Sequence, residues 1–551
     1  MLRDPENNAP GSLSDTVGVG ASPEADGPAP GAPPTLDTDG AASPALSPPD
    51  VDAPVLAASL SQALYTMQAT LASIEDQLGQ VELRRRSSAP AARARALPLP
   101  ASYRPTWFQL AALATAMLVV FLRLVNLDQL QNEFYGDLAL IYEYIAAIQA
   151  RHWPFHFTLS SGPLYHYLIM PVIAFTGPTY FGLKLASVLV SLGTLVATYA
   201  LSRRLIDDRF ALLATLVAGV SSWLLVFSRL GNTPILVPLL TTCALWLVVR
   251  IAHGGGAANV IACAVISALG LYLYPPSFVL APVIGLTLLC LRWTGLPIKW
   301  ADLWRFVITS LVCALPFAGI VSRDPYTFFS GYIGGKLTGS DNLIVALFTN
   351  LKNGLLAFHV RGDGIFRSNP AGLPHLDWIS GLLFLGGLVF WLLPERRRLS
   401  PVLLIPLVLL QVPSWLVLNR PHEVPSASRT LGVAPIAYIL VASGLWWLAR
   451  ARHAALPRWL GPTVAGVLVV AIVLLNAQRY FQDYIGGLPY QNTPIARIIV
   501  TYLDALPPET QIYLVGCCWE HDMPEPLSVK YVMARPERFS PIDPQAVTCD
   551  W

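Results

Sequence analysis

The chain has 551 residues, of which 54% are hydrophobic and only 13% are charged. Soluble domains carry about 45–50% apolar and about 25% charged residues, so this composition excludes an ordinary cytosolic globule. The mean hydropathy of +0.52 points the same way. There are 36 basic and 34 acidic residues, a net charge of +2. The bulk charge therefore predicts no polyanionic partner and no binding to nucleic acid.

The first 54 residues are rich in Ala, Pro, Gly, Ser and Asp and contain hardly any large apolar side chain. They carry nine acidic residues against one arginine. Such a segment cannot bury enough apolar surface to offset the entropy lost on ordering. Residues 1–54 are therefore predicted to be disordered.

Residues 55–86 have a different pattern, with apolar residues spaced alternately four and three apart. This is the seam of a heptad repeat and predicts a short coiled coil. One interpretation is a homo-oligomer formed through residues 57–83, and the other is an amphipathic helix lying on the membrane or on the body of the protein. A basic linker, 87–106, follows. The seam consists of Leu60, Leu64, Met67, Leu71, Ile74, Leu78 and Val81.

Residues 107–476 contain largely apolar runs, close to the length that crosses the hydrocarbon core of a bilayer. They predict an all-α polytopic membrane protein with about 11 transmembrane helices. A further segment, 162–177, is short and contains His166 and two prolines, so we interpret it as juxtamembrane or half-inserted. The eleven runs are 107–125, 181–201, 210–227, 234–251, 257–274, 276–292, 304–321, 378–393, 401–418, 431–448 and 460–476.

Basic residues decide the orientation, because the short cytoplasmic loops of membrane proteins are enriched in Lys and Arg. With eleven spans and a cytoplasmic N-terminus, the inner connections carry 13 basic residues, whereas the longer outer loops carry nine. This predicts a multi-pass protein of the cell membrane. Its first loop (about 126–180), a second large loop (322–377) and the C-terminal domain (477–551) are predicted to lie outside.

The C-terminal domain is predicted to be a small α/β unit. Thr493-Pro494 opens a helix that continues to about Ala505, and 511–515 is interpreted as a strand. Cys549 is expected to form a disulfide with Cys517 or Cys518, which are adjacent in the chain. The alternative is that Cys517 and Cys518 are free thiols. A zinc site with His521 is disfavoured because adjacent cysteines do not usually bind one metal. No metal or other cofactor is predicted.

The first outer loop is the richest in groups suited to catalysis. Glu133 and Asp137 are four residues apart, so they share one face of a helix, and an apolar stripe lies on an adjoining face. This pattern is typical of a helix in the membrane interface. A carboxylate there is partly desolvated, which raises its basicity and suits it to general-base catalysis. The alternative is a solvated loop with ordinary surface acids. The stripe is Leu138, Ile141, Ile145 and Ile148.

Several motifs follow this loop in a characteristic order. They are Gly-Pro-Leu-Tyr-x-Tyr at 162–167, Leu-Ser-Arg-Arg-Leu at 201–205 and Phe-Ser-Arg-Leu-Gly-Asn at 227–232. The order resembles the C-type superfamily of integral-membrane glycosyltransferases, specifically bacterial members of the protein O-mannosyltransferase and aminoarabinose-transferase branch. The segments 362–377 and 428–432 also resemble features of that branch.

The resemblance implies inverting transfer of a sugar from a polyprenyl-phosphate carrier in the membrane to a protein, lipid or glycan acceptor on the outer face. In such enzymes an acidic residue of the first loop deprotonates the acceptor hydroxyl. The lipid phosphate is the leaving group, stabilised by Arg or Lys and, in some branches, by a metal ion. A donor dissolved in the membrane requires a site at the interface, and the charge that develops on its phosphate requires a nearby cation.

The sequence departs from the family pattern at the catalytic acids. The family's Asp-Glu pair falls either on Asn132-Glu133 or on Asp137-Leu138, and neither placement keeps both acids. We favour Asp137 as the base over Glu133. The acid that often precedes Pro-Leu in the second motif is here Gly162.

The cations predicted to hold the donor phosphate are Arg229, at the outer end of the third span, and Arg420 and Arg429, in the loop between spans nine and ten. Arg229 has the alternative role of an interfacial arginine whose head reaches toward water. The residues expected to line the substrate site are Tyr135, Tyr165, His166, His375 and Asp377. The alternative is that they are ordinary residues of the membrane surface or of loops.

Two other functions compete with the transferase. Transporters or flippases of lipids or small solutes place ionisable residues at mid-membrane and often show internal repeats, whereas here the span centres hold almost no charge. A catalytically silent scaffold that acts through the heptad helix is the second competitor, because the acid pair is incomplete.

Overall fold

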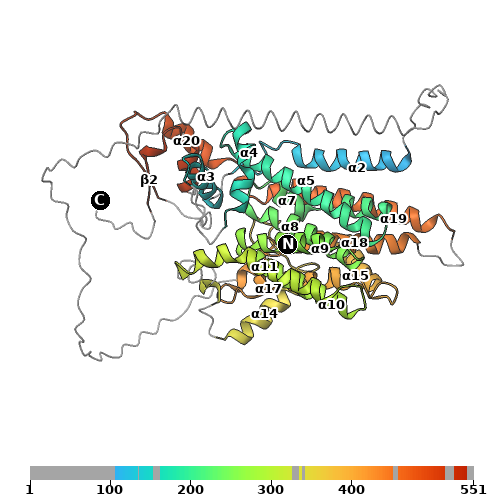
Figure 1. Cartoon of the computed structure of the whole chain (residues 1–551). Coiled ribbons are helices and arrows are strands. Elements are labelled where there is room, and N and C mark those ends of the chain that lie inside the picture. The colour runs from blue at the N-terminus through green and yellow to red at the C-terminus, as the bar shows by residue number, and fades with distance from the viewer. Residues whose placement is uncertain are drawn as a thin grey trace, which may run out of the picture. The chain divides into compact units, whose positions relative to one another are not determined.

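The computed structural model describes residues 106–133, 136–152, 162–325, 334–337, 342–450, 457–515 and 526–542 (Figure 1). The described chain is mostly helical, which confirms the predicted fold class. The predicted disordered N-terminus (1–54), the heptad helix (55–86), Tyr135, the three C-terminal cysteines and His521 lie outside the described residues.

Each of the eleven apolar runs coincides with a helix or with a pair of adjoining helical segments. The helices are α2 (Trp107–Leu124), α3 (Gly136–Gln149), α4 (Leu164–Thr176), α5 (Tyr180–Leu205), α6 (Asp208–Val220), α7 (Ser222–Ser228), α8 (Leu236–Ala252), α9 (Ala257–Ala268), α10 (Leu280–Trp293), α11 (Trp300–Val321), α13 (Gly335–Leu337), α14 (Leu343–Leu356), α15 (Trp378–Leu392), α16 (Pro401–Leu409), α17 (Val412–Trp415), α18 (Ala434–Arg450) and α19 (Leu460–Gln478).

Seven helices in the described part of the chain are long and apolar enough to cross a membrane. An eighth span results if α6 and α7, which meet at 63°, are taken as one broken helix. Five further apolar helices are shorter, and one of them is α4, which falls on segment 162–177, interpreted above as juxtamembrane or half-inserted. The protein is therefore a multi-pass membrane protein, and within the described residues several of the eleven apolar runs form short or interrupted helices.

Helix α18 lies at the centre of the bundle. In the membrane-spanning segment that contains α18, 83% of the apolar stretch is buried inside the protein, compared with 6% in α11. Helix α15 packs closely along α18 at two glycines. A Cβ atom on Gly387 would lie 1.9 Å from the carbonyl oxygen of Leu440, and one on Gly444 would lie 2.1 Å from that of Leu383. Small residues of this kind let the backbones of membrane helices approach.

The C-terminal segment forms the small α/β unit that the sequence predicts. The predicted helix is α20 (Ile495–Asp504) and the predicted strand is β1 (Ile512–Val515). After α21 (Pro526–Val532), strand β2 (Phe539–Ile542) pairs in parallel with β1, with Ile512 opposite Phe539. A small core of its own holds the unit together: Ala496, Val500, Ile512, Val529, Met533 and Phe539.

We predict that Gly387→Ala destabilises the bundle by about 1–3 kcal/mol, the usual range for overpacking, because the new methyl group overlaps a backbone carbonyl of α18. The thermal unfolding midpoint in detergent measures the loss. Gly466→Ala is the control, since a Cβ atom there meets nothing within 4 Å. Equal midpoints for the two variants would contradict the close contact.

Candidate functional site

The first loop is tied to the bundle by Arg229, which follows α7 and is completely buried. Its guanidinium donates to the carbonyl oxygens of Leu122 (2.8 Å), Val125 (2.7 Å) and Asn126 (3.1 Å), where α2 ends. The last carbonyls of a helix have no partner within the helix, so these bonds stabilise the end of α2. The contacts indicate a structural role for Arg229, and phosphate binding by this residue stays a prediction.

A second buried cation acts on the same loop. Lys184, in the second turn of α5, donates to the carbonyl oxygens of Leu127 (3.1 Å) and Leu130 (2.8 Å). Its ammonium group also lies 4.2 Å from the centre of the Tyr180 ring. Sequence reasoning missed Lys184, although a single lysine inside an apolar run is the signal that identifies such a residue.

Glu133 is buried and contacts the C-terminal unit. One of its carboxylate oxygens accepts a hydrogen bond of 3.3 Å from the backbone N–H of Ala496, in the first turn of α20. The first N–H groups of a helix attract negative charge. Asn492 adds two contacts, accepting from the N–H of Asn132 (2.9 Å) and donating to the carbonyl of Gln129 (3.1 Å). The C-terminal unit is therefore held on the first loop.

Asp137 is the second residue of α3, whereas Glu133 lies before this helix, so the predicted sharing of one helix face by the two acids is wrong. The apolar stripe of this helix is buried: Leu138, Ile141, Ile145 and Ile148. Farther along α3, Glu143 accepts a hydrogen bond from the hydroxyl of Tyr531 in α21. The base candidate thus lies on a helix packed between the bundle and the C-terminal unit.

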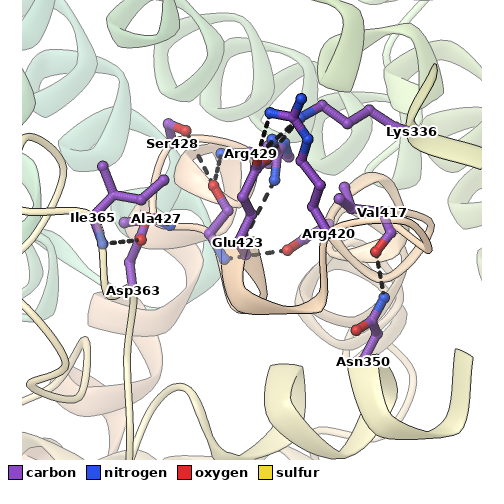
Figure 2. Close-up of polar contacts among 12 residues, drawn as sticks. Lys336, Asn350, Asp363, Ile365, Val417, Arg420, Glu423, Ala427, Ser428 and Arg429 are labelled. Atoms are coloured by element: carbon purple, nitrogen blue, oxygen red, sulfur yellow. Dashed lines mark hydrogen bonds and ion pairs between the residues drawn. The ribbon is translucent and has the colours of Figure 1, made fainter. Parts of the chain in front are cut away.

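Arg420 and Arg429, grouped from the sequence, do lie together. Figure 2 shows both, with Lys336 from α13, converging on Glu423. Lys336 Nζ lies 2.9 Å from both carboxylate oxygens of Glu423, and Arg420 donates to the same carboxylate at 3.2 Å. Arg429 forms a third ion pair with it. We call Lys336, Arg420, Glu423 and Arg429 the cationic cluster.

The charges in the cluster keep Glu423 ionised. Its burial opposes ionisation, but hydrogen bonds and charges of Arg429 and Lys336 outweigh that effect and lower its pKa to about 2. Three cations around one carboxylate leave an excess of positive charge. Neither Lys336 nor Glu423 was predicted from the sequence. Lys336 is far from the other three residues in the chain, whereas the spacing of Glu423, three residues after Arg420, is a local signal that could have identified it.

Asp363 supports the loop that carries Arg429. Its buried carboxylate accepts from the N–H of Ile365 (2.8 Å) and from that of Ala427 (2.7 Å). Burial raises its pKa to about 6, against the opposing effect of these hydrogen bonds and of Arg429. This carboxyl therefore titrates close to neutral pH beside the cationic cluster.

His375 and Asp377 occupy structural positions. His375 is buried with its ring against Trp223, centroids 4.3 Å apart. Burial, assisted by the charge of Arg479, lowers its pKa to about 3, so it is neutral at physiological pH. Asp377 caps the start of α15 by accepting from Ser380, and it also accepts from Asn476 of α19 at 2.8 Å. Substrate contact by either residue stays a prediction.

Tyr165 and His166 are both buried at the start of α4. The hydroxyl of Tyr165 lies 3.1 Å from Oγ of Ser187, and the His166 ring packs edge-on against Tyr144 of α3 at 4.9 Å. These contacts join α4 to its neighbours α3 and α5. Among the residues with described placement, no three His, Cys, Asp or Glu side chains are grouped as metal ligands would be.

Comparison with known proteins gives one match in sequence. A family model described as dolichyl-phosphate-mannose-protein mannosyltransferase matches residues 160–320. No curated protein has a significant match. The family match confirms, over those residues, the resemblance predicted from the order of the motifs.

Solved structures that are similar to this chain include ArnT and AglB. ArnT from Cupriavidus metallidurans, bound to undecaprenyl phosphate, has 16% identity and a TM-score of 0.49, covering 79% of this chain and 90% of that one. A second structure is the oligosaccharyltransferase AglB from Archaeoglobus fulgidus, in complex with an inhibitory peptide and a dolichol-phosphate. It has 14% identity and a TM-score of 0.43, and the match covers 80% of this chain and 64% of the AglB chain.

We predict that Glu423→Gln destabilises the protein by about 3 kcal/mol, because breaking a largely buried ion pair leaves uncompensated charge. The lowered pKa means that the stabilisation is present above the ordinary value of 4.5 and disappears as the pH falls toward about 2. Thermal unfolding of both proteins between pH 3 and pH 8 measures the difference.

The control for this change is Glu395→Gln, which neutralises an exposed acid. We expect it to leave the midpoint unchanged at every pH. A difference between wild type and Glu423→Gln that stays constant down to pH 3 would contradict the ionic origin of the effect.

Proposed function

We propose that this protein is an inverting glycosyltransferase that moves a sugar from a polyprenyl-phosphate carrier to a protein, lipid or glycan acceptor on the outer face of the cell membrane. The family match over residues 160–320 supports the class of enzyme. The observation that carries the donor assignment is the cationic cluster, in which three cations surround one carboxylate. Arg420 is the most accessible of them, with 57% of its side chain exposed.

The cluster suits a leaving phosphate. Inverting transfer forms the bond between the acceptor oxygen and the anomeric carbon while the bond from that carbon to the phosphate oxygen breaks. The phosphate leaves with the electron pair, so its negative charge increases in the transition state. Cations already held in place by Glu423 stabilise this charge without having to reorganise. Arg229 stays a predicted donor ligand in this assignment, although both of its Nη atoms already donate to the carbonyls that end α2.

The acceptor proton goes to a first-loop carboxylate, and we assign this role to Asp137. Glu133 is the alternative base, but its carboxylate is buried and already accepts from Ala496. Asp137 lies in the first turn of α3, on the loop predicted to face the outside. A carboxylate near an interface is a stronger base than one in bulk water. Tyr135, Tyr165, His166, His375 and Asp377 complete the proposed substrate lining.

The assignment includes an orientation and a division into domains. The transferase domain is 107–476, with a cytoplasmic N-terminus and an extracytoplasmic domain, 477–551. The 57–83 heptad segment is the proposed site of homo-oligomer formation. No nucleic acid is a proposed partner.

We predict that Asp137→Asn abolishes the release of polyprenyl phosphate when the purified protein is given a polyprenyl-phosphate sugar and an acceptor, because an amide accepts no proton. The released lipid is measured by mass spectrometry. Full turnover by this variant would contradict the role of Asp137. If Glu133→Gln alone is inactive, the two roles are exchanged. Movement of the intact donor across vesicles without sugar release would support a flippase instead.

We predict that Arg420→Gln lowers kcat/KM for the donor at least tenfold, which corresponds to about 1.4 kcal/mol, because one cation is lost from the phosphate site. The matched control is Arg361→Gln, which removes an exposed cation outside the cationic cluster. Steady-state kinetics at varied donor concentration measures both. Equal values for the two variants would place the donor phosphate elsewhere.

A further inference from the structure

A groove lies between the start of α15 and the end of α19. Its volume is about 630 Å³, within the range of about 300–1,000 Å³ found for small-molecule sites. None of the four residues of the cationic cluster lines it. The lining side chains that matter are Asp377, Trp378, Leu382, Gln478, Arg479 and Asp483.

Arg479 gives the groove its cation. One end of its guanidinium, Nη2, donates to the carbonyl oxygen of Pro374 at 2.7 Å. The other end, Nη1, is buried and has no hydrogen-bond partner within the described residues. A buried donor without an acceptor costs about 1–3 kcal/mol. An anion in the groove would remove this cost.

The acidic residues of the groove differ from each other. Both carboxylate oxygens of Asp377 accept hydrogen bonds from protein groups, so this residue is already engaged. Asp483 is exposed and follows Arg479 by four residues along the chain. The groove therefore offers one cation and one available anion close together.

Most of the remaining lining residues are apolar, and two of them are largely exposed. Trp378 and Leu382 are 68% and 65% exposed, respectively, on a helix of the apolar bundle. Exposed Trp near the end of such a helix is typical of the level of lipid headgroups. Apolar side chains at this position match the acyl part of a lipid.

We propose that the groove binds a zwitterionic aminophospholipid, with its phosphate on Arg479, its ammonium group on Asp483 and an acyl chain along Trp378 and Leu382. The pairing of one cation with one anion matches such a headgroup better than the headgroup of a purely anionic lipid. The proposal goes beyond the transferase function and does not depend on it.

Native mass spectrometry of the full chain, with equal amounts of phosphatidylethanolamine, phosphatidylglycerol and phosphatidylcholine added, tests the proposal. We expect retained phosphatidylethanolamine to exceed phosphatidylglycerol for the wild type. Arg479→Gln should reduce phospholipid retention at least fivefold, and Asp483→Asn should remove the preference between those two lipids. Arg361→Gln, outside the groove, is the matched control and should behave as the wild type.

Leu382→Trp provides a second variant, because it fills the exposed apolar side of the groove while every polar contact stays. It keeps the test valid if Arg479→Gln fails to fold, and we expect it to reduce retention as well. Wild-type retention by Leu382→Trp and by a folded Arg479→Gln would overturn the proposal. So would an unchanged lipid preference in Asp483→Asn, or displacement of the phospholipids by equimolar polyprenyl phosphate.

Discussion

The contact on which the first loop depends is the buried Arg229 guanidinium on the carbonyls that end α2. A membrane interior offers no water to such carbonyls, so the protein itself must supply the donors. Lys184 does the same for the carbonyls that follow. Two buried charges thus fix the backbone from which α3 starts. The position of the proposed base follows from this hydrogen bonding rather than from packing alone.

The helices were predictable because the bilayer limits the length of an apolar run, and all eleven runs contain helix. Their continuity was not predictable from hydropathy. Segment 210–227, for example, is a single apolar run but bends by 63° at Ser221 between α6 and α7. The C-terminal helix and first strand were also identified correctly, since a Thr-Pro start and a short apolar run are local signals.

The site was only partly predictable. Arg420 and Arg429 are near each other in sequence, so their grouping could be inferred. Their partner Lys336 comes from a distant segment, and nothing local identifies it. The sequence position of Arg229 fits either phosphate binding or stabilisation of a helix end, so the sequence does not distinguish the two roles. The three carbonyls that its guanidinium contacts favour the second role. Asp363 stands in an Arg-Gly-Asp tripeptide that predicts nothing by itself, yet burial raises the pKa of its carboxyl to about 6 beside the cationic cluster.

The end of α19 departs from α-helical geometry, as residues Arg479–Tyr484 form a π-helix. A π turn is in effect an α-helix with one inserted residue. From this turn Arg479 reaches the carbonyl of Pro374, while the hydroxyls of Tyr480 and Tyr484 bond the side chain of Gln131 in the first loop. Deleting one residue here would rotate all that follows by about 100°. The inserted residue therefore determines the direction in which the chain leaves the end of α19. A change of one residue in this turn would prevent the C-terminal unit from contacting the first loop.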